Sequence, residues 1–513
     1  MYRFLFLAFL NLLLSSCQGD DNALDYKEES IPLNFTSYKF EKAKNANLNE
    51  DVVLTIGNSD TLLAYIPELE YADSLIPTFS VDWRQFEKVT VGGAEQKSGV
   101  THQDYSRIVQ YDLECLDKRK KTVYIKVLVA NAIPRIDVET EGAVGITSKK
   151  DYVKAIIRIS NCPEVGTMVS EGKIRGRGNA SWSHPKKSYK IKFSKKQSPF
   201  GFPDNKDWVL LGNYTDRSLL RTAYMSEVSK ALNMKFTVNY QHVDLYLNGD
   251  YRGTYMLTDH VEKAKNRVNV NADGFFIEAD NYYQYEPLWF ITELYHKTMT
   301  FKYPDPDDGE IVKDDDNYLF IQDFMNKVEK TVTEIPNGSR EYLNYIEPHS
   351  FAKYIIAEEV LANFDSNIYY VLQSRDAKLE MYPLWDFEWS LGMGEVDENG
   401  WIAPPYQPRT DKSFWNNIPY VRFMLQDPDF VSILKEEWRF FKENVPAIKE
   451  KIKSVRHSLN YTQEDNFKKW PILDKFVSKE VIALGDWNLE VDYINNFFDK
   501  RVEWCDNFFL NEL

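Results

Sequence analysis

The sequence is poor in several features that would each identify a class of protein. It has 4 cysteines among 513 residues, which excludes a dense disulfide framework. Lys and Arg number 62 against 78 Asp and Glu, so the net charge is −16. Since neutralising the phosphates of a nucleic acid requires a basic face, this balance excludes nucleic acid as the main partner. After the first residues, no apolar run approaches the length that spans a membrane.

Histidine and cysteine show no spacing that is typical of metal or catalytic sites. Apart from Cys17 near the start of the chain, three cysteines remain: Cys115, Cys162 and Cys505. They are too widely spaced for a metal knuckle, and an odd number of thiols cannot form a full disulfide set. We therefore expect buried thiols. The 7 histidines form neither a His-x-x-x-His pair nor a triad pattern, so a structural role is expected for them.

Aromatic residues, by contrast, are abundant. They make up 15% of the chain, and apolar residues as a whole make up 43%. This composition argues against disorder, and surplus aromatic side chains often line ligand surfaces. A chain of this length exceeds a single hydrophobic core, so two or three domains are expected.

The first residues resemble a bacterial export signal. Arg3 precedes an apolar run that is too short to span a membrane, and residues 14–17 (Leu-Ser-Ser-Cys) resemble a lipobox. This pattern predicts a signal peptide over 1–17 and lipidation of Cys17; the alternative is an ordinary signal peptide. The polar, acidic residues that follow resemble those of Bacteroidetes surface lipoproteins. We therefore expect a lipid-anchored protein of the cell envelope, held by its acyl chains at the outer membrane surface.

Three further segments differ in pattern. Residues 18–45 are polar and lack periodicity, which predicts a flexible tether. Residues 46–132 contain short β-prone runs separated by turn residues, which predicts a small β-sandwich that resembles immunoglobulin-like modules. Such a module acts as a spacer or binds carbohydrate or protein. Residues 135–513 contain strands first and helices later, which predicts an α+β fold of two lobes.

Local periodicity places several elements in this last segment. Alternation of side-chain type predicts strands at residues 189–193 and 243–247. Apolar residues at helical spacing predict helices at residues 218–233, 351–363 and 430–453.

A basic segment is the first candidate for chemistry. Gly176 and Gly178 let backbone amides approach an anion, and Arg177 adds charge-assisted donors. Six lysines follow within eleven residues, and on a strand Lys190 and Lys192 point to the same face. This segment either binds phosphate or is an exposed edge strand that lysines keep soluble.

An acidic constellation is the second candidate. Asp365 and Asn367 follow a predicted helix, whereas Asp386 and Glu388 lie two apart among bulky apolar residues, as in a buried strand. Buried carboxylates need a cation or hydrogen bonds, and oxygen ligands of this kind suit Mg²⁺ or Mn²⁺. Local turn bonds and buried hydrogen-bonded pairs are the structural alternatives, and paired carboxylates also serve glycosidases.

Several motifs together resemble the CotH (spore coat protein H) kinase family. The resemblance covers residues from about 135 to 400 closely, and the helical tail is similar to that of Bacteroidetes members. The motifs that carry it, in the family's order, are residues 173–193, 208–213 (Trp-Val-Leu-Leu-Gly-Asn), 218–221 (Ser-Leu-Leu-Arg), 247–255 and 385–388 (Trp-Asp-Phe-Glu). The family implies an atypical protein-kinase-like fold that binds ATP and a divalent metal ion, with Ser of secreted proteins as acceptor.

The resemblance also implies roles for individual residues. Positioning and charge neutralisation dominate phosphoryl transfer, so each implied role is one of binding or orientation. Asp365 would be the catalytic residue, and Asp386, Asn367 and Glu388 would bind the Mg²⁺ or Mn²⁺ ion. The residues implied in ATP binding are Lys192 first and Lys187 second, with Lys190, Arg177, Gly176 and Gly178, together with Glu227 as partner of the lysine and residues 276–281 as the link between lobes that contacts adenine.

Two departures from the family pattern bear on activity. Glu388 stands where the family usually has Asp, and the interval from Asp365 to Asn367 is shorter than in spore-coat members. We expect an extracytoplasmic kinase that phosphorylates Ser or Thr of an unidentified surface or secreted protein. The alternatives are a pseudokinase that binds nucleotide without turnover and a surface scaffold that binds glycan or protein; a glycosidase leaves the lysine-rich strand unexplained.

Overall fold

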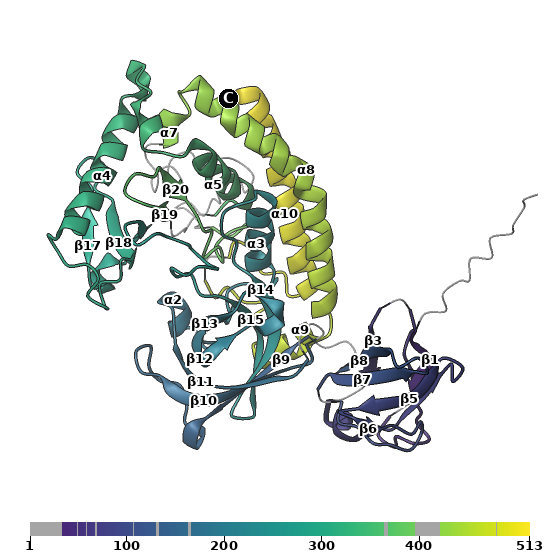
Figure 1. Cartoon of the computed structure of the whole chain (residues 1–513). Coiled ribbons are helices and arrows are strands. Elements are labelled where there is room, and N and C mark those ends of the chain that lie inside the picture. Colours follow the sequence, from purple (N-terminus) through teal and green to yellow (C-terminus); the bar gives the residue numbers. More distant parts are fainter. Residues whose placement is uncertain are drawn as a thin grey trace, which may run out of the picture.

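A computed structural model of the chain describes residues 33–513 except 49, 58, 67–68, 106, 130–132, 163–165, 364–367, 395–420 and 479 (Figure 1). The predictions for Cys17, Asp365 and Asn367 therefore lie outside the described residues. Strands dominate the first part of the chain and helices the last part, which confirms the predicted mixture and its order.

The N-terminal part is built from two sheets that share one hydrophobic core. A three-stranded sheet has the order β2-β1-β4, and a five-stranded sheet has the order β3-β8-β7-β5-β6. Tyr38, Leu62 and Tyr111 are among the residues that fill the core between them. The strand bounds are β1 Phe35–Phe40, β2 Val52–Val53, β3 Thr61–Ile66, β4 Pro77–Val81, β5 Phe86–Val91, β6 Ala94–Glu95, β7 Val109–Cys115 and β8 Lys120–Val129.

Strand β1 corrects the predicted extent of the tether. It lies inside residues 18–45, yet it pairs with both β2 and β4, and Phe35, Tyr38 and Phe40 are buried. The sequence pattern is hidden because the register shifts between Phe35 and Ser37, which interrupts the alternation of buried and exposed residues. The folded part of the chain therefore begins before residue 46.

A closed barrel of seven strands forms the next part, in the order β10-β11-β12-β13-β15-β14-β9. Side chains of alternate residues fill its interior, including Ile174, Ile191 and Trp208, because successive residues of a strand point to opposite faces. The bounds are β9 Arg135–Thr140, β10 Val153–Ser160, β11 Met168–Gly176, β12 Tyr189–Gln197, β13 Asn205–Leu211, β14 Tyr240–Leu247 and β15 Asp250–Asp259. Along the chain, the short helix α2 (Ala180–Ser183) follows β11, and helix α3 (Arg221–Ala231) follows β13.

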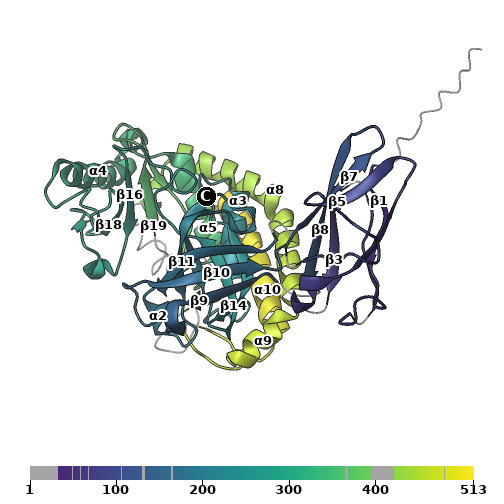
Figure 2. The same cartoon turned by 60° about the horizontal axis from the view of Figure 1, so that its bottom comes forward.

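A second sheet and the C-terminal helices form the remaining part. The sheet has the order β17-β18-β16-β19-β20, with bounds β16 Phe275–Ala279, β17 Trp289–Ile291, β18 Thr298–Tyr303, β19 Ile368–Leu372 and β20 Leu379–Met381. The helices are α4 Asp316–Thr333, α5 Pro348–Leu361, α7 Val421–Met424, α8 Pro428–Leu459, α9 Thr462–Lys469 and α10 Trp487–Asn507. One large core joins this sheet to α3, α5, α8 and α10 (Figure 2).

Helix α9 returns from the end of the chain to the barrel. The Asn466 side-chain oxygen accepts hydrogen bonds from Lys186 Nζ (2.8 Å) and from the Thr254 amide (3.1 Å). Trp470 donates to the Arg252 carbonyl (2.8 Å), and Gly253, at φ +104°, leaves the room that these side chains need. The helical tail is therefore anchored on the β14–β15 hairpin.

The predicted elements agree with the structure at most positions. Strands β12 and β14 and helices α3, α5 and α8 occupy the predicted places. Cys115, Cys162 and Cys505 are buried, as expected. Among the described residues, no helix is both long enough and apolar enough to cross a bilayer.

Candidate functional site

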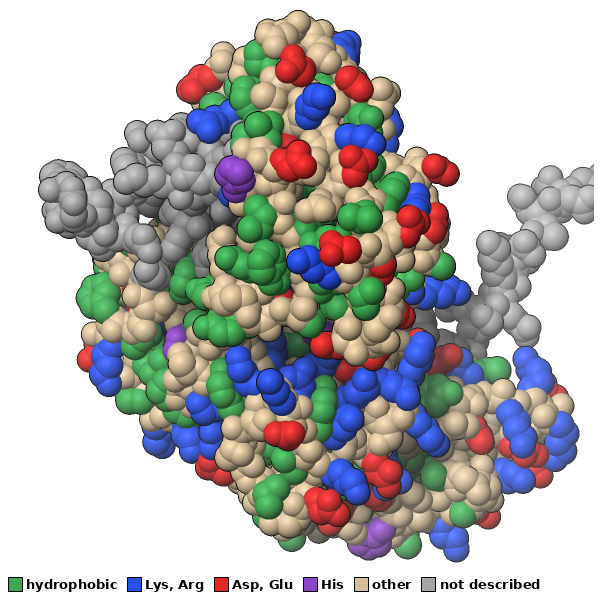
Figure 3. Space-filling view, turned by 90° about the vertical axis from the view of Figure 1, so that its left-hand side faces the viewer, with side chains coloured by type: hydrophobic (Ala, Val, Ile, Leu, Met, Phe, Trp, Pro, Cys, Tyr) green, Lys and Arg blue, Asp and Glu red, His purple; other side chains and the backbone are tan. Residues whose placement is uncertain are grey.

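A cavity of about 240 Å³ lies between the barrel and the β16 sheet. On the face shown in Figure 3, basic side chains gather across the middle of the molecule, between the barrel below and the sheet above. The residues that line the cavity are Arg177, Gly178, Asn179, Ala180, Ser181, His184, Leu211, Thr215, Glu278, Asp280, Asn281, Tyr282, Glu286, Lys302, Tyr369, Trp385, Asp386, Glu388 and Trp389.

The loop after β11 supplies the barrel's side of the cavity. Arg177 follows the last residue of β11, and its guanidinium lies over the ring of Trp385, 5.6 Å from the ring centre. Gly176 is in contact with Trp182 of helix α2, and Gly178 has φ +84° and lies against Ser181. These glycines permit the close approach of α2, and Gly178 lines the cavity whereas Gly176 does not.

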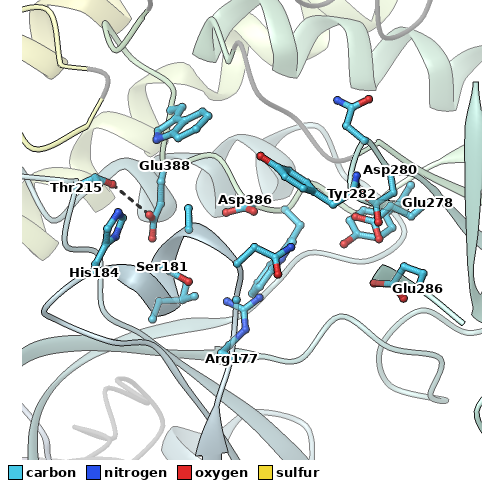
Figure 4. Close-up of a pocket in the computed structure, with 18 of the residues that line it drawn as sticks. Arg177, Ser181, His184, Thr215, Glu278, Asp280, Tyr282, Glu286, Asp386 and Glu388 are labelled. Atoms are coloured by element: carbon cyan, nitrogen blue, oxygen red, sulfur yellow. Dashed lines mark hydrogen bonds between the residues drawn. The ribbon is translucent and has the colours of Figure 1, made fainter. Parts of the chain in front are cut away.

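The acidic motif forms a turn and not the buried strand that its apolar neighbours predict. Residues 382–387 belong to no strand, and Asp386 has φ +64°, a left-handed conformation that non-glycine residues seldom adopt. Such strain persists only where the surrounding structure fixes it, and it clusters at functional sites. In Figure 4 the Asp386 carboxylate lies between Glu388 on one side and Glu278 and Asp280 on the other, with Arg177 below.

The Asp386 side chain is exposed and Glu388 is half-buried, and both line the cavity. Desolvation by the surrounding protein raises the pKa of Asp386, and the nearby Arg177 guanidinium opposes this increase. Burial, together with the charges of Asp386 and Asp216, raises the pKa of Glu388 to about 7. The Thr215 hydroxyl donates a hydrogen bond to Glu388 (3.3 Å). The acidic turn therefore favours a ligand that brings positive charge.

Arg221 holds the acidic turn in place through hydrogen bonds to the main chain that follows Glu388. Its guanidinium donates to the main-chain oxygens of Ser390 (2.8 Å) and Leu391 (3.3 Å) and pairs with Asp216 (2.7 Å). Arg221 and Asp216 are both buried. The Ser-Leu-Leu-Arg motif thus positions Glu388 from outside the cavity.

Lys186 is a second buried cation beside the motif. Its ammonium donates to the Thr254 carbonyl (2.6 Å) and to Asn466 (2.8 Å). Burial lowers the pKa of Lys186 to about 7, although the charges of Asp244, Glu388 and Asp216 favour the protonated form. Lys186 therefore connects the barrel to helix α9 of the helical tail.

The β16 sheet contributes a buried ion pair to the opposite wall. Lys302 of β18 pairs with Glu278 of β16 (2.6 Å), and both side chains line the cavity. Burial raises the pKa of Glu278 in spite of Lys302. Tyr369 of β19 also lines this wall, and burial beside Glu278 and Asp386 raises the pKa of its hydroxyl well above the ordinary value.

The predicted ATP-binding lysines lie outside the cavity lining. Lys187 donates to the main-chain oxygens of Trp182 (2.7 Å) and His184 (3.5 Å). Lys190 and Lys192 project from the outer face of the barrel and share the carboxylate of Asp207, at 3.1 Å and 3.3 Å. Among the described residues, Arg177 and Lys302 are the Arg and Lys side chains that line the cavity.

Two other predictions are corrected. In the part of the chain that the structure describes, no ion pair joins Glu227 to a lysine; Glu227 accepts a hydrogen bond from the Tyr240 hydroxyl (3.0 Å). Residues 276–281 are not a link between lobes. They contain most of β16, the central strand of its sheet, and Glu278, Asp280 and Asn281 line the cavity.

The residues present fit a magnesium or manganese ion that a ligand also coordinates. Asp386 and Glu388 offer oxygen donors at one position of the cavity. Within the described part of the chain, no three Asp, Glu, His or Cys side chains are placed to hold an ion by themselves. Mg²⁺ is usually held by one or two carboxylates together with phosphate oxygens of a substrate, so this set is sufficient only with such a ligand.

Sequence reasoning missed the roles of Lys302, Lys186 and Tyr369. Lys302 lies in an alternating run and Lys186 among neighbouring lysines, so neither position is distinctive in the sequence. Only the register between β16 and β18 brings Lys302 near Glu278, and only the return of α9 covers Lys186.

The chain was compared with known proteins. Residues 174–505 match the family described as CotH kinase protein. The match begins in β11 and ends in α10, and it includes every residue that lines the cavity. A comparison with curated proteins gives no match.

Proposed function

Because this chain belongs to the CotH kinase protein family, which is kinase-like, we propose that its cavity binds ATP and transfers the γ-phosphoryl group to a protein. The acceptor is a Ser or Thr hydroxyl of a surface or secreted protein. The observation that carries the proposal is the placement of Arg177 and Lys302 on the walls of a cavity that also contains Asp386 and Glu388. A triphosphate with its metal ion needs both kinds of charge within one cleft.

The residues of this chain divide the work between binding and orientation. Arg177 and Lys302 neutralise phosphate oxygens, and Asp386 and Glu388 hold Mg²⁺ or Mn²⁺, with Asn367 as a further ligand. When bound, the ion neutralises charge on the phosphate oxygens. The acceptor oxygen forms a bond to the γ-phosphorus as the bond to the bridging oxygen of ADP breaks. Asp365 takes the proton of the acceptor hydroxyl.

The location of this activity is part of the proposal. Cys17 carries the lipid anchor, and the chain is a Bacteroidetes-type lipoprotein displayed at the outer membrane surface. The N-terminal sheets form an immunoglobulin-like spacer, and the barrel and the β16 sheet act as two lobes around the cavity. Palmitate labelling of cells that express the wild-type chain and Cys17→Ala tests the anchor; equal labelling would contradict it.

Nucleotide binding is tested first. Thermal unfolding of the full chain is measured with a non-hydrolysable ATP analogue and MnCl₂. We expect an upward shift for the wild type, its loss in Asp386→Asn, and a normal shift in Asp376→Asn, an exposed aspartate outside the cavity lining. Absence of any shift in the wild type would overturn the proposal.

Phosphoryl transfer is tested separately with γ-labelled ATP and proteins of the cell envelope as acceptors. We expect Asp365→Asn to keep the nucleotide-induced shift and to lose transfer. Transfer that is equal in the wild type, Asp365→Asn and Asp386→Asn would refute the assigned roles.

One observation favours a second candidate, a pseudokinase that binds nucleotide without turnover. Glu388 stands where the family usually has Asp, and its side chain is longer by one methylene group. A longer side chain would place the carboxylate differently toward the metal ion and the phosphates. Nucleotide binding without transfer, restored to transfer by Glu388→Asp, would identify this candidate.

A further inference from the structure

The outer face of the barrel carries three lysines directly opposite one another on neighbouring strands. Lys154 of β10 is paired in register with Lys173 of β11, and Lys173 is paired with Lys192 of β12. The row ends at Asp207 of β13, which is opposite Lys192. We call Lys154, Lys173 and Lys192 the lysine row.

Acidic side chains act on the β12 end of the lysine row, where the charges of Asp207 and Glu262 are close to Lys190 and Lys192. Asp207 is shared between Lys192 and Lys190, and neither Lys154 nor Lys173 forms an ion pair with a described residue. The Lys173 ammonium lies over the ring of Tyr152, 4.4 Å from the ring centre. Lys154 and Lys173 are exposed.

A second pair of cations lies beside the lysine row. Arg175 of β11 is in register with Lys190 of β12, so five cationic side chains occupy three adjacent strands. Like charges directly opposite one another destabilise a sheet. In a chain whose net charge is −16, this concentration opposes the overall balance. A bound anion would relieve the repulsion, so the face is suited to an acidic partner.

The lysine row is continuous with the cavity. Lys173, Arg175 and Arg177 alternate along one side of the chain, and Arg177 lines the cavity. Arg177 is four positions after Lys173, a distance of about 13 Å at the rise of an extended chain. Burial lowers the pKa of His260 well below its ordinary value, and the charges of Lys190, Arg177 and Lys302 lower it further, so His260 is near cations of both regions.

We infer that the lysine row docks an acidic segment of the protein that accepts the phosphoryl group. This inference rests on the proposed function and adds the chemistry of the substrate: Asp or Glu residues that begin about four residues from the phosphorylated Ser or Thr in an extended chain. Neighbouring strands are about 4.8 Å apart, so the row spans about 10 Å, the length of three extended residues. A nucleic acid or an anionic membrane presents negative charge over a much longer distance than the lysine row. The net negative charge of this chain would repel such an extended anionic surface.

The test uses the full chain and two fluorescent peptides of one sequence, each with a single Ser. One carries three Glu residues four positions after the Ser, and the other carries Gln at those positions. We expect the Glu peptide to bind at least tenfold more tightly at 50 mM salt and to lose this advantage at 500 mM. The double variant Lys154→Gln/Lys173→Gln should lose the preference. The control Lys451→Gln/Lys453→Gln, which changes two exposed lysines of α8, should retain it.

The outcomes separate this inference from the proposed function. Peptide binding is measured without nucleotide, so a Glu preference that depends on the lysine row supports docking even where no phosphate is transferred. Transfer to both peptides at equal rates, or an undiminished preference in Lys154→Gln/Lys173→Gln, would overturn docking while the kinase remains. Binding of anionic vesicles or of single-stranded DNA that exceeds binding of the Glu peptide and depends on the same lysines would assign the face to that partner instead.

Discussion

The guanidinium of Arg221 donates a hydrogen bond to the main-chain oxygen of Ser390 (2.8 Å), two residues after Glu388. The two residues are 169 positions apart in the chain, and both are buried. Arg221 begins helix α3, so the first turn of that helix supports the acidic turn of the cavity. Asp216 keeps the guanidinium in place through a 2.7 Å ion pair.

Replacing Arg221 with Met should damage both stability and ligand binding. Removing one partner leaves the Asp216 carboxylate buried without its charge partner, which typically costs about 3–5 kcal/mol. We expect a loss of this size in urea unfolding and a reduced nucleotide-induced shift in melting temperature. Arg439→Met changes an exposed arginine of α8 and should alter neither quantity. Wild-type stability of Arg221→Met would show that the ion pair does not hold the turn.

The backbone of Asp386 leads to a second prediction. At φ +64° an alanine is strained by about 1–2 kcal/mol, whereas asparagine tolerates the left-handed region. Asp386→Asn should therefore be more stable than Asp386→Ala by about 1 kcal/mol, measured by urea unfolding. At Asp323, an exposed position of helix α4, the order should reverse because alanine has the higher helix propensity. The same order at both positions would contradict the assigned conformation.

The contact between Gly176 and Trp182 can be tested by a double-mutant cycle. A Cβ atom at Gly176 would lie 2.2 Å from a ring carbon of Trp182, so Gly176→Ala should cost about 1–3 kcal/mol. Trp182→Ala removes the obstacle, and the two changes should couple by more than about 1 kcal/mol. Gly145→Ala, where the added carbon meets nothing within 4 Å, should be close to neutral. Additive effects of the two changes would show that the residues are not in contact.

His242 should contribute to loss of stability in acid. Burial lowers its pKa to about 4, and its ring nitrogen Nε2 lies 2.7 Å from the Leu219 carbonyl oxygen. In the unfolded chain His242 binds a proton at the ordinary pKa of 6.5. The neutral His242 side chain therefore contributes its full stabilisation to the folded state above pH 6.5, and this stabilisation is lost as the pH falls from 6.5 to about 4. Between pH 7 and pH 5 the loss is about 2 kcal/mol.

The measurement is urea unfolding of the wild type and His242→Gln at both pH values. The variant should lose less stability than the wild type on acidification, whatever its stability at pH 7. His457→Gln, an exposed histidine in the last turn of α8, is the control and should follow the wild type. If His242→Gln and the wild type lost equal free energy of unfolding on acidification, the pKa of His242 would be the same in the folded and the unfolded chain, which would contradict this prediction.

Local patterns in the sequence were sufficient for the elements whose environment is simple. Strand β12 alternates because one face fills the barrel and the other faces away from it, so Lys190 and Lys192 were placed correctly on one side. Helix α8 was predictable from its single apolar stripe. The acidic turn was not, because the apolar residues around Asp386 contact several separate elements instead of one sheet face.

The sequence predicted which types of residue form the site, but it predicted only part of the contacts between them. Arg177, Asp386 and Glu388 line one cavity, whereas the lysines of β12 face outward. The lysine that lines the cavity is Lys302 of β18, and it pairs with Glu278. Such pairs depend on strand register between distant segments, which a single sequence does not encode locally.

The hydrogen bond from Lys186 to Asn466 joins positions 280 residues apart. While the chain emerges from the ribosome, the barrel is complete long before its lysine meets this acceptor. A chain that ends before helix α9 lacks Asn466, so it cannot complete this contact between the barrel and the helical tail.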